Sequence, residues 1–72
     1  MMINSMSEIS EAVKARRKSL GLTQTQCAQM CNVGNRFFSE LENGKETLQI
    51  GKVINCLVML GINITLNNRE DV

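Results

Sequence analysis

The sequence is poor in the residues on which catalysis, metal binding and cross-linking usually depend. Its 72 residues include no His, Trp, Tyr or Pro, only two Phe and only three Cys. Without His, and with too little volume for a closed pocket, an enzyme is close to excluded. Cys27 and Cys31 are spaced for one face of a helix rather than for a zinc knuckle. We therefore expect buried thiols, no disulfide framework, no metal and no cofactor.

Long apolar runs are also missing. No stretch approaches the ~20 apolar residues of a membrane span, and the first residues, MMINSMSE, lack the basic region of a secretory leader. The sequence thus predicts a cytoplasmic protein without a membrane partner. The formal net charge is only +1, but residues 14–52 hold seven basic and three acidic side chains. A basic middle of this size permits an anionic partner.

Gly and Asn divide the chain into short helices. The apolar periodicity predicts helices over about 6–20, 24–31, 35–43 and 49–60, all within one domain spanning 1–72. Ser5 with Glu8, and Thr23 with Gln26, have the spacing of capping boxes. We expect the helices to end at Gly21, Asn32, Asn43-Gly44 and Gly61, residues that tolerate the left-handed conformation after a helix.

The end of the chain indicates a second copy. The predicted helix over 49–60 is apolar almost all the way round, which a surface helix of a monomer is not. Residues 62–66, Ile-Asn-Ile-Thr-Leu, alternate as a half-buried strand does, yet the rest of the chain is helical and offers this strand no partner. Pairing with the same strand of another copy about a two-fold axis is the simplest solution. We predict a homodimer whose interface includes Val58, Ile62, Asn63, Ile64, Thr65 and Leu66.

Two short helices joined by a tight turn, the second of them amphipathic, describe a helix-turn-helix. Residues 21–45, GLTQTQCAQMCNVGNRFFSELENGK, resemble the repressor-type (Cro/XRE) DNA-binding domain at about ten positions without a gap, including Gln24, Ala28, Val33 and the Glu-x-Gly-Lys close at 42–45. Asn32 and Gly34 depart from the family pattern of Gly and Ser or Thr. The resemblance implies an all-α, lambda-repressor-like bundle of four helices over 6–60, followed by the dimerisation strand over 62–66.

Adjacent Phe37 and Phe38 cannot both face one core, because neighbours in a helix point about 100° apart. Phe38 shares a face with Val33 and Leu41 and is predicted to be the core aromatic. Phe37 then either rests on a thymine methyl or a sugar, or folds over the edge of the core against the first helix.

The outward residues near the start of the second helix are the expected base readers. They are Asn35, Arg36, Phe37, Ser39 and Glu40. Arg36 can contact guanine or merely phosphate and solvent, and Asn35 can pair with adenine or stabilise the helix start. Glu40 can accept from cytosine or pair with Arg36 four residues earlier.

Contacts to the DNA backbone are expected on both sides of this helix. Gln24 lies at a predicted helix start, where N–H groups favour phosphate, and Asn43, Gly44 and Lys45 form the loop after the recognition helix. The family resemblance also implies that Arg17 and Glu42 form a partly buried ion pair, which is structural rather than DNA-binding.

Residues 49–66, QIGKVINCLVMLGINITL, look like the end of HipB-type antitoxins, which repress their own operon and bind a kinase-fold toxin of the HipA type. That group's longer tail is nearly absent, since 67–72, NNREDV, is a short polar tail without an aromatic anchor. The resemblance implies a DNA-binding repressor of a palindromic operator, and more narrowly an antitoxin. The alternatives are a stand-alone phage-type repressor, or a helix-turn-helix adaptor that binds proteins without specific DNA binding.

Overall fold

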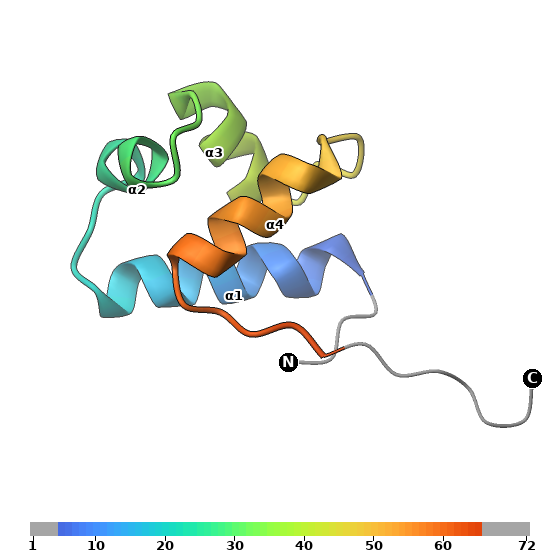
Figure 1. Cartoon of the computed structure of the whole chain (residues 1–72), viewed down its shortest axis with the longest axis horizontal. Coiled ribbons are helices and arrows are strands. Elements are labelled where there is room, and N and C mark those ends of the chain that lie inside the picture. Colours follow the sequence, from blue (N-terminus) through green and yellow to red (C-terminus); the bar gives the residue numbers. More distant parts are fainter. Residues whose placement is uncertain (1–4, 66–72) are drawn as a thin grey trace, which may run out of the picture.

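The computed structural model describes residues 5–65, and these residues form four helices. Helix α1 spans Met6–Ser19, α2 spans Gln24–Met30, α3 spans Asn35–Glu42 and α4 spans Ile50–Met59 (Figure 1). Each lies within one or two residues of its predicted bounds, so the helical part of the predicted fold is confirmed. Within these residues no helix has the length and hydropathy of a membrane span.

The core lies where α4 crosses α1 and where both face the pair α2 and α3 (Figure 1). Its largest fully buried side chains are Phe38, Leu41, Leu57 and Leu60. Phe38 is therefore the core aromatic, as predicted. Filling this space with apolar side chains is the main favourable contribution to folding. The core also fixes the orientation of α3, the helix expected to meet DNA.

The three thiols belong to the core. Cys27, Cys31 and Cys56 are free and buried, as expected, and burial raises the pKa of Cys56 to about 12. Sγ of Cys31 lies 3.9 Å from the carbonyl oxygen of Cys56, a contact that links α2 to α4. These cysteines therefore act as small apolar packing residues.

All four described helices end in the same way. After each C-cap, one backbone N–H bonds back across five residues and the previous one across three, which is the Schellman motif. The residue that needs positive φ is glycine after α1, α3 and α4, and Asn32 (φ 57°) after α2. Asn32 is thus a working substitute for the glycine of the family pattern. The predicted helix ends are confirmed.

The helix starts agree only in part with prediction. At α2, Thr23 Oγ1 accepts from the N–H of Gln26 at 3.1 Å, and Oε1 of Gln26 accepts from the N–H of Thr23 at 2.8 Å. This is the predicted capping box. At α1 the predicted box is wrong, because Ser5 makes no side-chain cap bond and its Oγ instead lies 2.9 Å from Oγ of Ser7.

Helix α4 has two apolar sides, as its sequence indicated. Val53, Cys56 and Leu57 are buried in the core. On the outer side, Ile50, Ile54 and Val58 form a stripe, four residues apart, with exposures of 62%, 45% and 66%. We call these three residues the α4 stripe.

The chain after α4 keeps the predicted alternation. Ile62 and Ile64 are half-buried against the core, whereas Asn63 and Thr65 are exposed. Residues 62–64 form no strand within the described part of the chain, Thr65 makes a single β-bridge, and Leu66 lies outside the described residues. The predicted strand pairing requires a second copy and stays a prediction.

Candidate DNA-binding surface

The unit formed by α2, the turn and α3 is held from inside. Ala28 is fully buried, as expected for the site where two helices cross closely. The turn between them is fixed by hydrogen bonds from Asn32 N to Gln29 O at 3.1 Å and from Val33 N to Ala28 O at 2.9 Å. Gly34 then serves as the N-cap of α3 without a side-chain bond. The start of α3 is thereby presented at the surface on a rigid support.

Helix α3 separates its core residues from its outward residues. Phe38, Leu41 and Glu42 are buried. Asn35 is exposed, and the side chain of Arg36 is 90% exposed. Ser39 is half-buried. The two residues at the start of α3 are therefore the most accessible of the predicted base readers.

The Phe37 side chain packs against the core rather than projecting into solvent. Its ring is half-buried against the core, and Nζ of Lys52, in the first turn of α4, lies 5.9 Å from the ring centroid. An ammonium group at this distance over a ring is attracted by the ring electrons. The second aromatic thus covers the edge of the core beside α4, whereas the alternative reading had placed it against α1. Its predicted base contact rests on the part of the ring that is still exposed.

Glu40 is shared by two basic side chains. Its Oε2 accepts from Nζ of Lys45 at 2.9 Å and lies 3.7 Å from Nε of Arg36. The pairing with Arg36 that the spacing allowed is present, but Lys45 is the closer partner. The hydrogen bond from Lys45 is the main cause that holds the pKa of Glu40 below its usual value.

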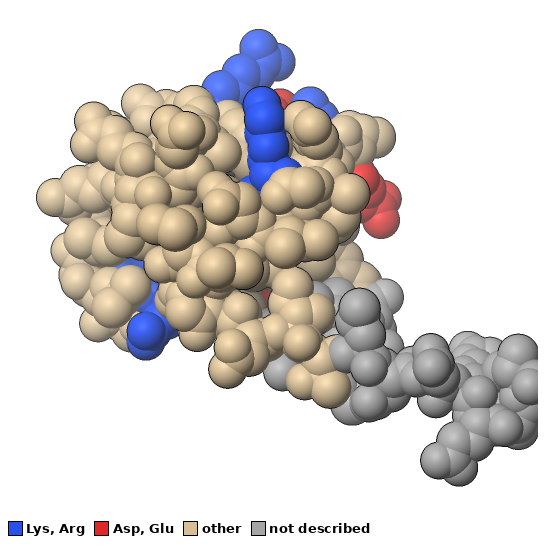
Figure 2. Space-filling model, in the orientation of Figure 1, with Lys and Arg blue, Asp and Glu red and all other residues tan. Residues whose placement is uncertain are grey.

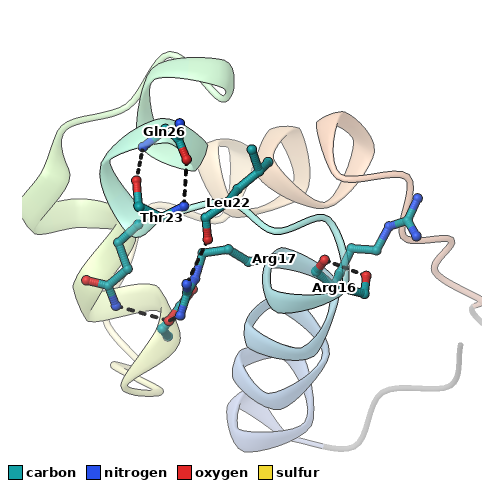
Figure 3. Close-up of polar contacts among 8 residues, drawn as sticks. Arg16, Arg17, Leu22, Thr23 and Gln26 are labelled. Carbon is teal, nitrogen blue, oxygen red and sulfur yellow. Dashed lines mark hydrogen bonds and ion pairs between the residues drawn. The ribbon is translucent and has the colours of Figure 1, made fainter.

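Beneath this surface, Arg17 and Glu42 form the predicted buried ion pair. Nε and Nη2 of Arg17 donate to the two carboxylate oxygens of Glu42 at 2.5 and 3.1 Å, and the Glu42 side chain is 1% exposed. Nη1 of Arg17 also donates to the carbonyl of Leu22 at 3.0 Å (Figure 3). One guanidinium therefore joins α1, the loop before α2 and the end of α3.

Gln24 is the third partner of Glu42. Its Nε2 donates to Oε1 of Glu42 at 3.0 Å, so its side-chain amide faces inward. Gln24 remains the first residue of α2, and its backbone N–H points out of the helix start. The expected phosphate contact therefore falls to the backbone of Gln24 and not to its side-chain amide.

The stability of the fold should fall in acid through Glu42. Burial raises the pKa of this carboxyl, but the hydrogen bonds from Arg17 and Gln24 outweigh burial, and the net pKa is lowered. A lowered folded-state pKa adds stability above the unfolded value, near ~4.3, and that stability is lost as the pH falls further. We expect urea midpoints to drop from pH 6 to pH 3 less steeply in Glu42→Gln than in the wild type. Equal slopes would contradict this role, and Glu40→Gln controls for the other carboxyl with a lowered pKa.

The loop after α3 lies at the other side of that helix. Asn43 is exposed, Gly44 is half-buried with φ of 79°, and Lys45 is exposed. A side chain at Gly44 would be strained by this backbone conformation, and its Cβ would lie 3.5 Å from Oγ of Ser10. Their contacts to the DNA backbone stay a prediction, and Lys45 is already bonded to Glu40.

Three further contacts were not predicted from the sequence. Nε of Arg16 donates to the carbonyl of Leu60 at 2.8 Å, which satisfies the end of α4 from α1. Nδ2 of Asn55 donates to the carbonyl of Cys31 at 2.9 Å. Lys52 covers Phe37. The first two join residues 44 and 24 positions apart, so no local pattern announces them.

Charge is distributed unevenly over the face drawn in Figure 2. Figure 2 shows basic side chains projecting from the edge where α3 and the start of α4 lie, and few acidic ones on the same face. Basic side chains beside an exposed helix start suit a polyanion. An exposed helix start and neighbouring basic side chains are the features expected of a DNA-binding surface.

Comparison with known proteins agrees with this geometry. The helix-turn-helix family profile matches residues 13–67, which is most of the chain. The chain belongs to this helix-turn-helix family. The chain is 41% identical over 64 residues to the uncharacterized HTH-type transcriptional regulator y4mF of Sinorhizobium fredii, an alignment that covers 89% of this chain and 84% of y4mF. The family is one of DNA-binding regulators rather than of enzymes.

Solved structures share the fold. MDT Protein superposes with a TM-score of 0.80 at 24% identity, covering 94% of this chain and 96% of that one. The HipA–HipB–O2–O3 complex gives the same TM-score, identity and coverage. The HipB–O1–O2 complex gives 0.79 at 24% identity, over 92% and 96% of the two chains. The HipB-like fold predicted from the sequence is confirmed for the helical bundle.

Proposed function

We propose that this helix-turn-helix protein is a sequence-specific transcriptional repressor that binds a palindromic operator as a homodimer. The observation that carries the proposal is the exposed start of α3, where Asn35 and the 90%-exposed side chain of Arg36 stand on a helix fixed by the core. The first residues of a recognition helix are those that reach base edges in the major groove. Ser39, Glu40 and the exposed edge of Phe37 extend the same surface.

Contacts to phosphate flank the base readers. The backbone of Gln24 lies on one side of α3, and Asn43, Gly44 and Lys45 lie on the other. Such contacts fix the register of a protein on the duplex but carry no sequence information. Two recognition helices of a dimer would then enter the major groove about one DNA turn, ~34–36 Å, apart.

The interface with the second copy is assigned to the α4 stripe and to the segment that follows α4. Exposed Ile50, Ile54 and Val58 form an apolar face of α4, the helix that precedes the predicted strand over 62–66. The half-buried and exposed alternation of 62–65 supports pairing of this segment with its own copy across a two-fold axis. Both features are satisfied by the same partner, a second chain.

A narrower role as an antitoxin fits the structural neighbours. HipB occurs among them in a complex with HipA and operator sequences. By analogy, this protein would repress its own operon and bind a kinase-fold HipA-type toxin in the cytoplasm. Fold-level likeness alone supports this part, so co-purification with the product of an adjacent kinase-like reading frame is its test.

Fluorescence anisotropy tests the repressor itself. The probe is duplex DNA from upstream of the gene, and the control is a scrambled duplex, each at two salt concentrations. A specific regulator should bind the native duplex at least ~1000-fold more tightly. Equal, weak and steeply salt-dependent binding to both duplexes would contradict the proposal and favour the protein-binding adaptor.

Arg36→Ala should reduce discrimination between the two duplexes without harming the fold. A bidentate contact to guanine is worth ~1–3 kcal/mol, so we expect the native duplex to bind about 5- to 150-fold more weakly and the scrambled duplex to change much less. The Arg36 side chain is 90% exposed, so thermal unfolding should be almost unchanged. Lys18→Ala, which removes an exposed charge from α1, is the control. An equal loss on both duplexes would reassign Arg36 to phosphate.

A further inference from the structure

Glu40 lies among the basic groups of the proposed DNA surface. Its Oε2 is bonded to Nζ of Lys45 at 2.9 Å and lies 3.7 Å from Nε of Arg36. Arg36 is assigned above to a base and Lys45 to a phosphate. A carboxylate between them opposes binding to any polyanion, because it holds both cations and repels phosphate.

The local backbone builds this arrangement. In the turn that ends α3, the N–H of Lys45 donates to the carbonyl oxygen of Glu40 at 3.1 Å, which returns the loop to that residue. Arg36 precedes Glu40 by one helical turn and so shares its face. The Glu40 side chain is 28% exposed, against 90% for Arg36 and 45% for Lys45. The acid is therefore the least accessible member of the three, and its partners extend beyond it.

We propose that Glu40 is a specificity-determining residue that restrains Lys45 and Arg36 and thereby weakens binding to DNA of arbitrary sequence. The inference rests on the proposed DNA-binding function and assigns a role to one residue of the same surface. Binding that ignores sequence comes from cations that neutralise phosphates. On DNA of arbitrary sequence, both Lys45 and Arg36 must leave Glu40 to reach phosphates, and the full cost of release opposes binding. At the operator, Arg36 contacts a base from the same helix face as Glu40 and keeps its pairing with that carboxylate, so the cost of release is smaller.

The matched pair of variants is Glu40→Gln and Glu46→Gln. Both remove one negative charge from the same region of the chain. Glu46 is exposed and forms no ion pair within residues 5–65, so its replacement changes net charge without releasing a cation. Each variant is titrated by anisotropy against the native and the scrambled duplex at two salt concentrations, after its thermal unfolding has been compared with that of the wild type.

On the scrambled duplex, Glu40→Gln should bind at least about threefold more tightly than Glu46→Gln, because an exposed ion pair is lost as well as a charge. On the native duplex the gain should be smaller, so the ratio of native to scrambled affinity falls. Equal affinity of the two variants for the scrambled duplex would overturn the proposal. Weaker binding of Glu40→Gln to the native duplex alone would also overturn it and would assign Glu40 to a cytosine amino group.

A double-mutant cycle between Glu40 and Lys45 separates restraint of the Lys45 side chain from simple repulsion between the Glu40 carboxylate and DNA phosphates. If Glu40 acts by holding Lys45, the effect of Glu40→Gln on scrambled DNA should shrink toward that of Glu46→Gln in a Lys45→Met background, where only Arg36 is left for Glu40 to hold. An undiminished effect would contradict restraint. The scrambled-duplex comparison is independent of operator recognition: a wild type that fails to prefer the native duplex defeats the proposed function, while the two variants still decide the role of Glu40.

Discussion

Glu42→Ala is expected to lower the free energy of unfolding by about 3–5 kcal/mol, the usual effect of removing one partner of a buried ion pair. Small domains have ~0.05–0.15 kcal/mol of stability per residue, which is only about 4–11 kcal/mol for a chain of this length. The loss is therefore a large share of the total stability, and the melting temperature of the variant should fall sharply. Thermal and urea unfolding followed by circular dichroism measure the loss.

The reason is the number of groups that Glu42 satisfies. Its carboxylate accepts from Nε and Nη2 of Arg17 and from Nε2 of Gln24, and its side chain is 1% exposed. Alanine leaves the Arg17 side chain, 14% exposed, without its counter-charge. The same change also frees the junction between α1, the start of α2 and the end of α3, so the helix-turn-helix loosens together with the fold.

Two further variants test whether the loss of stability comes from the unpaired charge of Arg17. Glu42→Gln retains the shape and should lose less stability than Glu42→Ala. The double variant Arg17→Met with Glu42→Leu removes both charges and should recover much of the loss, because an apolar pair of similar volume is often no less stable than a buried ion pair. A stability change near zero for Glu42→Ala would show that the pair contributes nothing to the fold.

Val58→Glu should abolish dimerisation and weaken operator binding by at least ~100-fold, since one half-site then binds alone. Val58 is 66% exposed in the single chain, so the substitution leaves the core untouched. In the proposed dimer, the two-fold axis brings two copies of the new carboxylate into one apolar interface. Burying like charges there opposes association.

The control is Ala15→Glu, which adds the same charge at an exposed position of α1 outside the α4 stripe. Sedimentation equilibrium measures the dimer, and anisotropy on the native duplex measures the operator affinity. The expected result is a monomeric Val58→Glu that binds native DNA weakly, beside a dimeric Ala15→Glu. A wild type that is monomeric at micromolar concentration would contradict the proposed homodimer.

Much of this protein was determined by its sequence alone, because the relevant interactions are local. The helix ends follow from single residues: Asn32 and the glycines after the other helices accept the positive φ that a Schellman motif requires. The capping box of Thr23 and Gln26 spans three residues and needs no tertiary partner. Phe38 entered the core because the helical period leaves only one of two neighbours facing inward. At Ser5 the same local reasoning failed, because a serine two residues on lies close to its hydroxyl.

Only the tertiary structure decided which partners the long polar and aromatic side chains contact. The spacing of Glu40 allowed Arg36 as a partner, but the loop after α3 brings Lys45 closer. The side-chain amide of Gln24 faces inward because it donates a hydrogen bond to Oε1 of Glu42. Phe37 packs beside Lys52 because α4 places that residue over the Phe37 ring. Arg16 and Asn55 bond to carbonyls of distant helices. Long side chains have many rotamers of similar energy, so their partners are chosen by neighbours that the chain brings together only on folding.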